Sequence, residues 1–229
     1  MSDNTVDMKA LTRRTNRLGI AVALVLGAVF FGTAGTLAYW QAWVYMGSLL
    51  VPLIFVARSL LRNSPGLLDR RLQVREREPA QKAIVSVGTT FLLAAFVLPG
   101  LDRRWGWSSV PAWAVIVADL VMLLGYGLIV RVFRENPFAS RTVEVTQDQQ
   151  VISSGPYAIV RHPMYVGVLL FYLASPLALG SWWALLPASL IVPMLVMRIL
   201  NEERVLERDL AGYSGYMQRT RYRLLPGIW

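Results

Sequence analysis

Residues 18–40 read LGIAVALVLGAVFFGTAGTLAYW, and this stretch contains no charged side chain. An α-helix needs about 20 predominantly apolar residues to cross the hydrocarbon core of a bilayer. Apolar runs of this length with few or no charges are typical of membrane-spanning helices rather than of soluble cores. The stretch therefore predicts a transmembrane helix.

Five further apolar segments follow along the chain. They cover residues 42–61, 83–101, 110–132, 164–179 and 182–200. Segment 164–179 is short for a span and contains Pro176, and Gly180 separates it from the last segment. The last two segments together predict a tight helical hairpin. The whole pattern predicts an all-α integral membrane protein with about six transmembrane helices.

Composition supports this class. Hydrophobic residues make up 55% of the chain and charged residues only 16%, whereas soluble domains carry about 25% charged residues. A net charge of +9 can indicate a nucleic-acid partner. Here the charged residues lie in the gaps between the apolar segments, so we do not interpret them as a nucleic-acid surface. The chain has no cysteine and one histidine, which excludes disulfides and thiolate chemistry and argues against a protein-built metal site.

The first segment also has to be considered as a signal peptide, since Arg13, Arg14 and Arg17 precede it. Its apolar run is longer than the 7–15 residues of a signal-peptide core, and no clean small-x-small cleavage site follows. We expect it to be retained as a membrane span.

All but two of the 23 Lys and Arg residues lie before the first segment, at 58–82, at 131–161 or at 198–223. With six spans, these four clusters fall on one side of the membrane, so the positive-inside rule predicts that both termini are cytoplasmic. We attribute the positive charge to topology and to anionic lipid headgroups. The membrane would be the inner membrane of a bacterium or the endoplasmic reticulum of a eukaryote.

The only histidine lies in GPYAIVRHPMYVG, residues 155–167. Pro163 suits the first turn of a helix, which would place His162 at the helix start beside exposed amide donors. A carboxylate could bind there, and Tyr157 and Tyr165 could offer flat faces to an aromatic ring. The alternative is that the polar residues and tyrosines only mark the membrane interface. Both interpretations remain open on local grounds.

A second polar stretch follows the sixth segment. Arg198 and Glu202 are four residues apart and share a helix face, and Glu203 lies on an adjacent face. Half-buried carboxylates at a membrane exit are costly unless they are paired, which makes them functional candidates. The alternative is an interfacial amphipathic helix whose charges are solvated.

The chain contains a set of motifs in a fixed order: GPY and RHPMY before the hairpin, then Arg198, EExxL, GYxxY and a final LPGIW. In this combination it resembles the isoprenylcysteine carboxyl methyltransferase family, whose relatives include the phospholipid methyltransferases. The resemblance covers about residues 134–229, with FRENPFAS as an upstream part. It divides the chain into a transmembrane region, 1–133, with a basic cytoplasmic loop at 62–82, and a methyltransferase core, 134–229, that ends in a cytoplasmic helical segment. The chain lacks the extra N-terminal helices of the mammalian enzymes, which leaves the substrate entrance open.

The resemblance implies S-adenosylmethionine-dependent methyl transfer at the cytoplasmic membrane face. By position, Arg198 corresponds to a substrate-side arginine, Glu202 to the acidic cofactor contact, and Glu203 completes the acidic pair. The other positions that correspond to cofactor contacts are Val151, Ile152, Tyr157, His162, Pro163, Met164 and Tyr165.

Physical chemistry agrees with these roles. Glu202 can pair with the ammonium of the cofactor, and His162 with the helix start can take its carboxylate. Arg198 can hold a carboxylate acceptor, whereas Glu203 can act as a base for an amine acceptor. The expected partners are membrane lipids and a lipophilic or prenylated acceptor, with an isoprenylcysteine-type carboxylate first and a lipid amine or small thiol as alternatives.

Two other classes remain to be tested. Membrane sterol and enone reductases carry a similar RHPxY and PGIY-like tail and use NADPH, but they are larger. A non-enzymatic assembly factor could also keep this fold, although the retained Arg198, Glu202 and His162 argue against it.

Overall fold

The computed structural model describes residues 7–63, 65–72, 79–138 and 149–229. The helices are α1 (Met8–Ala34), α2 (Trp40–Asn63), α3 (Pro65–Leu72), α4 (Pro79–Trp105), α5 (Ala112–Glu135), η1 (Gly155–Ala158), α6 (Pro163–Ala178), α7 (Leu185–Ser189), α8 (Ile191–Asp209) and α9 (Tyr213–Arg219). These described residues contain no β-strand, so the predicted all-α class is confirmed.

Four helical stretches in this part of the chain are long and apolar enough to cross a membrane. They are Met8–Ala34, Trp40–Asn63, Ala112–Glu135 and Leu185–Asp209, the last of which runs through α7 and α8. Helix α6 is a shorter apolar helix, and α4 contains the predicted segment 83–101. The chain is thus an integral membrane protein by its apolar helices, while the count of six spans stays a prediction.

The first helix differs from its predicted bounds. It begins ten residues before the predicted segment because Asp7 caps it, accepting hydrogen bonds from the backbone N–H groups of Lys9 and Ala10. It ends at Ala34 because Gly35 adopts a left-handed φ of +67°. The predicted segment 18–40 therefore contains a turn after residue 34, and the basic residues before it are helical.

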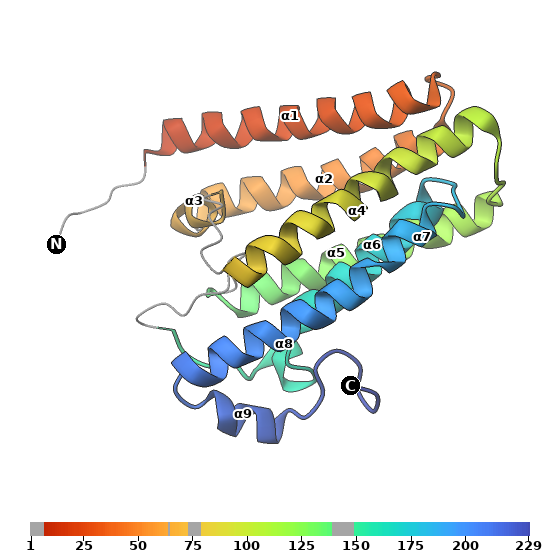
Figure 1. The fold of residues 1–229 in the computed structure, drawn as a ribbon. Helices are drawn as coiled ribbons and strands as arrows, with labels where there is room; N and C mark the ends of the chain where they lie inside the picture. Colours follow the sequence, from red (N-terminus) through yellow and green to blue (C-terminus); the bar gives the residue numbers. More distant parts are fainter. Residues whose placement is uncertain (1–6, 64, 73–78, 139–148) are drawn as a thin grey trace.

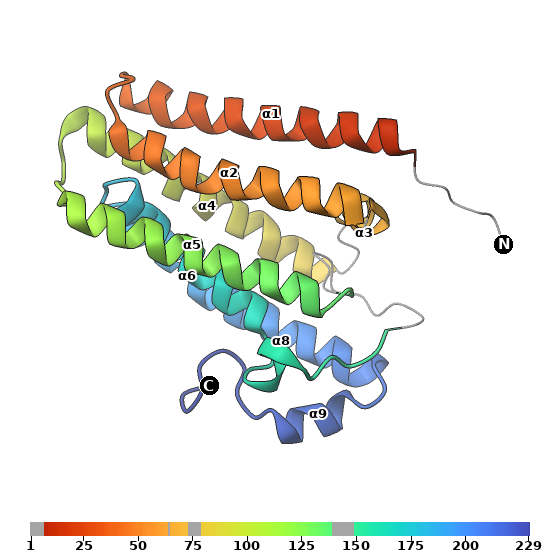
Figure 2. The same cartoon turned by 180° about the vertical axis from the view of Figure 1, so that it is seen from behind.

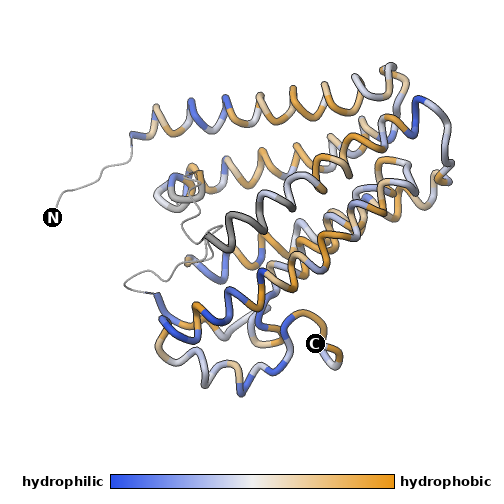
Figure 3. Tube along the Cα trace, in the orientation of Figure 1, coloured by the Kyte–Doolittle hydropathy of each residue, from blue (hydrophilic) through white to orange (hydrophobic). Residues whose placement is uncertain are grey.

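The long helices run side by side, with α1 on one face of the bundle and α8 and α9 on the other (Figures 1 and 2). One end of the bundle holds the beginnings of α1 and α6 and the ends of α2, α5 and α8, and we call it the basic end. Hydrophilic segments gather there, at the start of α1 and around the end of α8 and α9 (Figure 3). The loops and helix ends that the sequence singled out for chemistry thus lie at one end of the molecule.

Helices α5 and α6 pack closely because two glycines face each other. A Cβ added at Gly125 would lie 2.6 Å from the backbone oxygen of Gly167, and a Cβ at Gly167 would lie 2.7 Å from that of Gly125. Small residues at such a crossing allow two backbones to approach. This contact fixes the start of α6 against the middle of α5.

The opposite end of the bundle, called the far end, holds the turns at 35–39, 106–111 and 179–184. Asp102 ties two of these turns together, because it accepts hydrogen bonds from the backbone N–H of Ser108 at 2.8 Å and from the hydroxyl of Ser181. Exposed tryptophans gather at this end: Trp40, Trp43, Trp105, Trp107, Trp113, Trp182 and Trp183. Tryptophan is enriched where a helix bundle crosses the membrane–water interface.

Candidate functional site

A cavity of about 770 Å³, including its open mouth, lies at the basic end of the bundle. Its walls come from the end of α5, the 149–165 segment, the end of α8 and α9. Seven of the ten predicted site residues line it: Val151, Ile152, Tyr157, His162, Met164, Tyr165 and Glu202. Pro163, Arg198 and Glu203 do not line the cavity but adjoin residues that do. The structure thus gathers residues that lie far apart in the sequence.

The RHP motif forms the start of α6. His162 is the residue before the helix and Pro163 is its first residue, as predicted from the sequence. The backbone N–H groups of Arg161 and His162 donate to the carbonyl oxygens of Tyr222 and Arg223, at 2.8 Å and 2.9 Å. The C-terminal segment is therefore bound directly to the backbone that carries the histidine.

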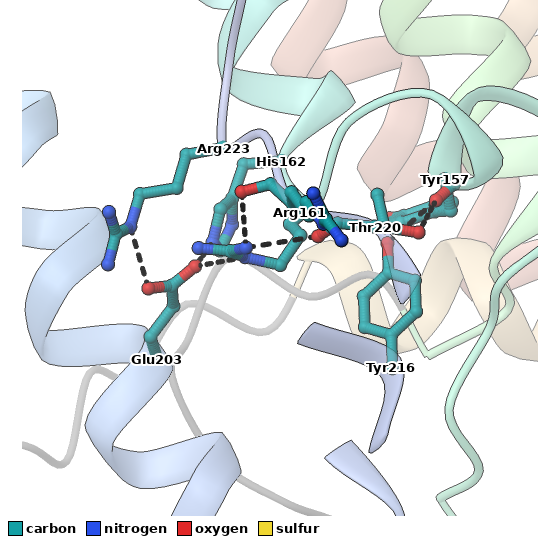
Figure 4. Close-up of polar contacts among 8 residues, drawn as sticks. Tyr157, Arg161, His162, Glu203, Tyr216, Thr220 and Arg223 are labelled. Atoms are coloured by element: carbon teal, nitrogen blue, oxygen red, sulfur yellow. Dashed lines mark hydrogen bonds and ion pairs between the residues drawn. The ribbon is translucent and has the colours of Figure 1, made fainter. Parts of the chain in front are cut away.

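Glu203 holds this corner of the site together. Its Oε1 accepts a hydrogen bond from Arg161 Nε at 2.7 Å and lies 3.1 Å from His162 Nε2, and its Oε2 accepts from Arg223 Nε at 2.8 Å (Figure 4). Arg161 also donates to the carbonyl oxygens of Thr220 and Arg221, at 3.0 Å and 2.8 Å. One carboxylate thus connects α8, the start of α6 and the C-terminal segment.

The electrostatics of Glu203 follow from these contacts. The residue lies beyond the predicted apolar segment 182–200, at the charged end of α8, and its side chain is buried. Burial by itself raises the pKa of the carboxyl, but hydrogen bonds from His162, Arg161 and Arg223 outweigh it and lower the pKa to about 2. Glu203 is therefore an anion at any physiological pH.

A second polar group joins α6 to α8 at the cavity wall. The Tyr165 hydroxyl donates to Glu202 Oε2, and Arg198 Nε donates to the Tyr165 oxygen at 2.9 Å. Arg198 and Glu202 share a helix face, as their spacing predicted, and both contact the same tyrosine. Arg198 and Glu202 are thus connected through the Tyr165 hydroxyl, and they are not simply solvated charges on an interfacial helix.

The wall opposite α6 comes from α9 and the end of α8, with Leu206, Leu210, Tyr213 and Tyr216. The Tyr216 hydroxyl donates to the backbone oxygen of Tyr157 at 2.8 Å, which fixes α9 against the 155–158 turn (Figure 4). The Tyr213 hydroxyl is buried and has no hydrogen-bond partner among the described residues.

Sequence reasoning did not assign a role to several lining residues. Arg161 was treated only as a neighbour of the histidine, because nothing local shows that its side chain turns toward a distant glutamate. Asn136, which donates to the Tyr157 hydroxyl at 3.0 Å, had no signal of its own. Tyr213 and Tyr216 were visible as GYxxY, and their three-residue spacing could have placed them on one face of a helix.

Residues 113–211 match the phospholipid methyltransferase family. The predicted resemblance to this group of membrane methyltransferases is confirmed. The match begins one helix before the region that the motifs indicated and ends before the last 18 residues. It thus includes α5 and the glycine contact with α6.

The fold is also that of a solved membrane enzyme. The chain is similar to the eukaryotic intramembrane Ras methyltransferase, isoprenylcysteine carboxyl methyltransferase, with 19% sequence identity and a TM-score of 0.56. The similarity covers 92% of this chain and 77% of that one. At 19% identity the similarity establishes the fold alone, and the activity has to be inferred from the residues of the site.

Proposed function

We propose that this protein transfers a methyl group from S-adenosylmethionine to a lipophilic acceptor at the cytoplasmic face of the membrane. The observation that carries the proposal is the cavity at the basic end, which brings the RHPMY and EExxL residues together at the end of an apolar bundle. The family of residues 113–211 and the fold support the same activity.

The residues around the cavity fit the methyl donor chemically. Glu202 offers a carboxylate to an ammonium group, and the start of α6, next to His162, suits a carboxylate. Tyr157 and Leu206 give the cavity flat and apolar wall for an adenine ring. When bound, S-adenosylmethionine supplies a methyl group on a sulfonium cation, and the protein supplies alignment and a site from which water is excluded.

Arg198 favours a carboxylate as the acceptor. Its guanidinium adjoins the cavity through Tyr165 and lies at the membrane exit of α8, where the polar end of a lipid would arrive. A planar guanidinium suits a carboxylate better than it suits an amine. We therefore place an isoprenylcysteine-type carboxylate first and a lipid amine second.

An amine acceptor would need a general base, and Glu203 was the candidate for it. The surroundings of Glu203 fit a positioning role better. A general base works best with a pKa near the operating pH, whereas the pKa of Glu203 is lowered to about 2 after burial is outweighed by three donors. Both of its oxygens are occupied by Arg161, His162 and Arg223. In this proposal Glu203 orients His162 and the C-terminal segment.

A methyl-transfer assay tests the proposal. The purified protein in lipid bilayers would receive S-adenosylmethionine with a radiolabelled methyl group and, in separate reactions, a prenylcysteine analogue, a phosphatidylethanolamine or a small lipophilic thiol. We expect labelling of the prenylcysteine analogue, and its loss in Glu202→Gln. Glu207→Gln is the matched control, because Glu207 is exposed on the same helix. Labelling of the lipid amine alone would replace the acceptor, and equal labelling by Glu202→Gln would remove Glu202 from the site.

Calorimetry separates this proposal from the reductase class. We expect S-adenosylhomocysteine to bind the purified protein and NADPH not to bind. Binding of NADPH without binding of the methyl-donor analogue would contradict the proposed function.

A further inference from the structure

Tyr213 lines the cavity at the basic end, and its buried hydroxyl has no hydrogen-bond partner among the described residues. The residue is the first of α9, only 4% of its surface is exposed, and it lines the cavity at the basic end. Among the described residues no atom lies within hydrogen-bond distance of its hydroxyl in suitable geometry. Buried polar groups in native proteins nearly always have partners, and an unpaired one destabilises the fold.

The charged groups near Tyr213 are engaged elsewhere. Both oxygens of Glu203 accept hydrogen bonds from Arg161, His162 or Arg223, and Glu202 Oε2 accepts from Tyr165. Arg161 donates from Nε to Glu203 and from Nη1 to two backbone oxygens. The partner of the Tyr213 hydroxyl is therefore not supplied by these neighbours.

The charges around Tyr213 indicate which part of a bound molecule would meet it. Burial raises the pKa of its phenol, and the negative charges of Glu203 and Glu202 raise it further, while Arg161 acts in the opposite sense. The hydroxyl thus keeps its proton and is available as a donor. The amino-acid end of the methyl donor carries an ammonium and a carboxylate, both of which can form a hydrogen bond with a neutral hydroxyl, whereas the adenosine end carries no charge.

We propose that the Tyr213 hydroxyl is a binding contact for the amino-acid end of the methyl donor. This inference rests on the proposed function, and it assigns to α9 a direct part in binding.

Tyr216 provides a matched comparison three residues further on in the same helix. Its hydroxyl is also buried at the cavity wall, but it donates to the backbone oxygen of Tyr157 at 2.8 Å. Replacing either tyrosine by phenylalanine removes one oxygen and keeps the ring. In Tyr216→Phe the change breaks a hydrogen bond within the protein, whereas in Tyr213→Phe it removes a group that has no partner before the ligand binds.

The experiment measures the thermal stability of each variant without ligand and the dissociation constants of two ligands by calorimetry. S-adenosylhomocysteine has the amino-acid end, and 5′-methylthioadenosine shares the adenosine and the sulfur but lacks that end. For Tyr213→Phe we expect an unfolding temperature equal to or above that of the wild type, about tenfold weaker binding of S-adenosylhomocysteine, and unchanged binding of 5′-methylthioadenosine. For Tyr216→Phe we expect a lower unfolding temperature.

Three results would overturn the inference. A lower unfolding temperature for Tyr213→Phe would mean that the hydroxyl has a partner within the protein. Wild-type affinity of this variant for S-adenosylhomocysteine would remove the contact, and equal weakening of both ligands would move it to the adenosine. A wild-type protein that binds neither ligand would contradict the proposed function itself, which distinguishes that failure from the other three.

Discussion

Folding changes the ionisation of Glu203 strongly. Its carboxyl pKa falls from 4.5 to about 2, because hydrogen bonds from His162, Arg161 and Arg223 outweigh the effect of burial. A pKa that is lowered in the folded state stabilises the fold above the unfolded value and loses this effect as the pH falls toward the folded value. The shift corresponds to about 3 kcal/mol of unfolding free energy at neutral pH.

The replacement Glu203→Gln should therefore lower the unfolding free energy by about 3 kcal/mol at pH 7, since the buried Arg161 and the half-buried Arg223 lose their anion. The difference from the wild type should shrink as the pH falls from 4.5 toward 2. Chemical denaturation in detergent micelles at several pH values measures it. Glu207→Gln, on the exposed face of α8, should change little. A difference that stays constant over this pH range would mean that shape, and not charge, stabilises this corner.

Arg198 should depend on the geometry of its guanidinium and not only on its charge. Its Nε donates to Tyr165, which a lysine cannot reproduce while it also meets an acceptor. We expect Arg198→Lys to lower kcat/KM for the acceptor by about tenfold or more and to leave the binding of S-adenosylhomocysteine within about twofold.

Steady-state assays and calorimetry separate these two effects of Arg198→Lys. Arg204→Lys is the control, because Arg204 is exposed on the same helix. An Arg198→Lys variant with wild-type kcat/KM would show that a point charge is sufficient at this position.

At this scale the sequence indicated the residue types well and their partners poorly. His162 and Pro163 could be placed because capping is a local property of the chain. The contacts of Glu203 could not, because its three donors come from positions 161, 162 and 223. No spacing rule relates a glutamate in one helix to an arginine 42 residues before it.

At the scale of helices, the contact between α5 and α6 limits what the bundle tolerates. A Cβ at Gly125 would meet the backbone oxygen of Gly167 at 2.6 Å and the backbone nitrogen of Phe171 at 2.9 Å. Backbone atoms cannot move aside as a flexible side chain can, so the helices must separate.

We expect Gly125→Ala to lower the unfolding free energy by about 1–3 kcal/mol, the usual cost of overpacking, and to weaken binding at the cavity, because α6 carries His162. Gly127→Ala in the same helix is the control. A Cβ there meets nothing within 4 Å, and alanine favours helix by up to about 1 kcal/mol relative to glycine. Thermal unfolding of the two variants checks this, and equal stabilities would exclude a tight crossing.

Helix positions were predictable where apolar runs were long and unpredictable where the helix carries polar residues. Helix α1 extends back to Met8 through a basic stretch because of its Asp7 cap. The short helices α3 and α9 are too brief to give a clear period. Helix α9 nevertheless completes the cavity wall. The resemblance implied that the C-terminal segment covers the cofactor, but Tyr213 and Tyr216 were not assigned to the site individually.

At the scale of the whole molecule, the two ends of the bundle differ in chemistry. Basic residues mark one end and exposed tryptophans the other, as expected for the two interfaces of a membrane. The absence of cysteine from the sequence makes this orientation straightforward to test.

Single cysteines introduced as Glu207→Cys at the basic end and Ser109→Cys at the far end lie at exposed positions. A membrane-impermeant maleimide should label Ser109→Cys in intact cells or sealed vesicles and Glu207→Cys only after permeabilisation. The cysteine-free wild type is the control for background labelling. The reverse pattern would place both termini and the cavity on the other side of the membrane.

The tryptophans at the far end also fix how deep the cavity lies. The helical stretch that follows Trp183 begins at Leu185. From there to Glu202 it rises about 26 Å, which is close to one hydrocarbon thickness. The cavity thus sits level with the headgroups of one leaflet, and we expect the proposed acceptor to carry its reactive group at that level. In a bilayer of longer acyl chains the resulting hydrophobic mismatch draws the cavity away from the headgroups. If the protein is the proposed methyltransferase, we expect its turnover to fall as the bilayer thickens, which assays in vesicles of different acyl-chain length would measure.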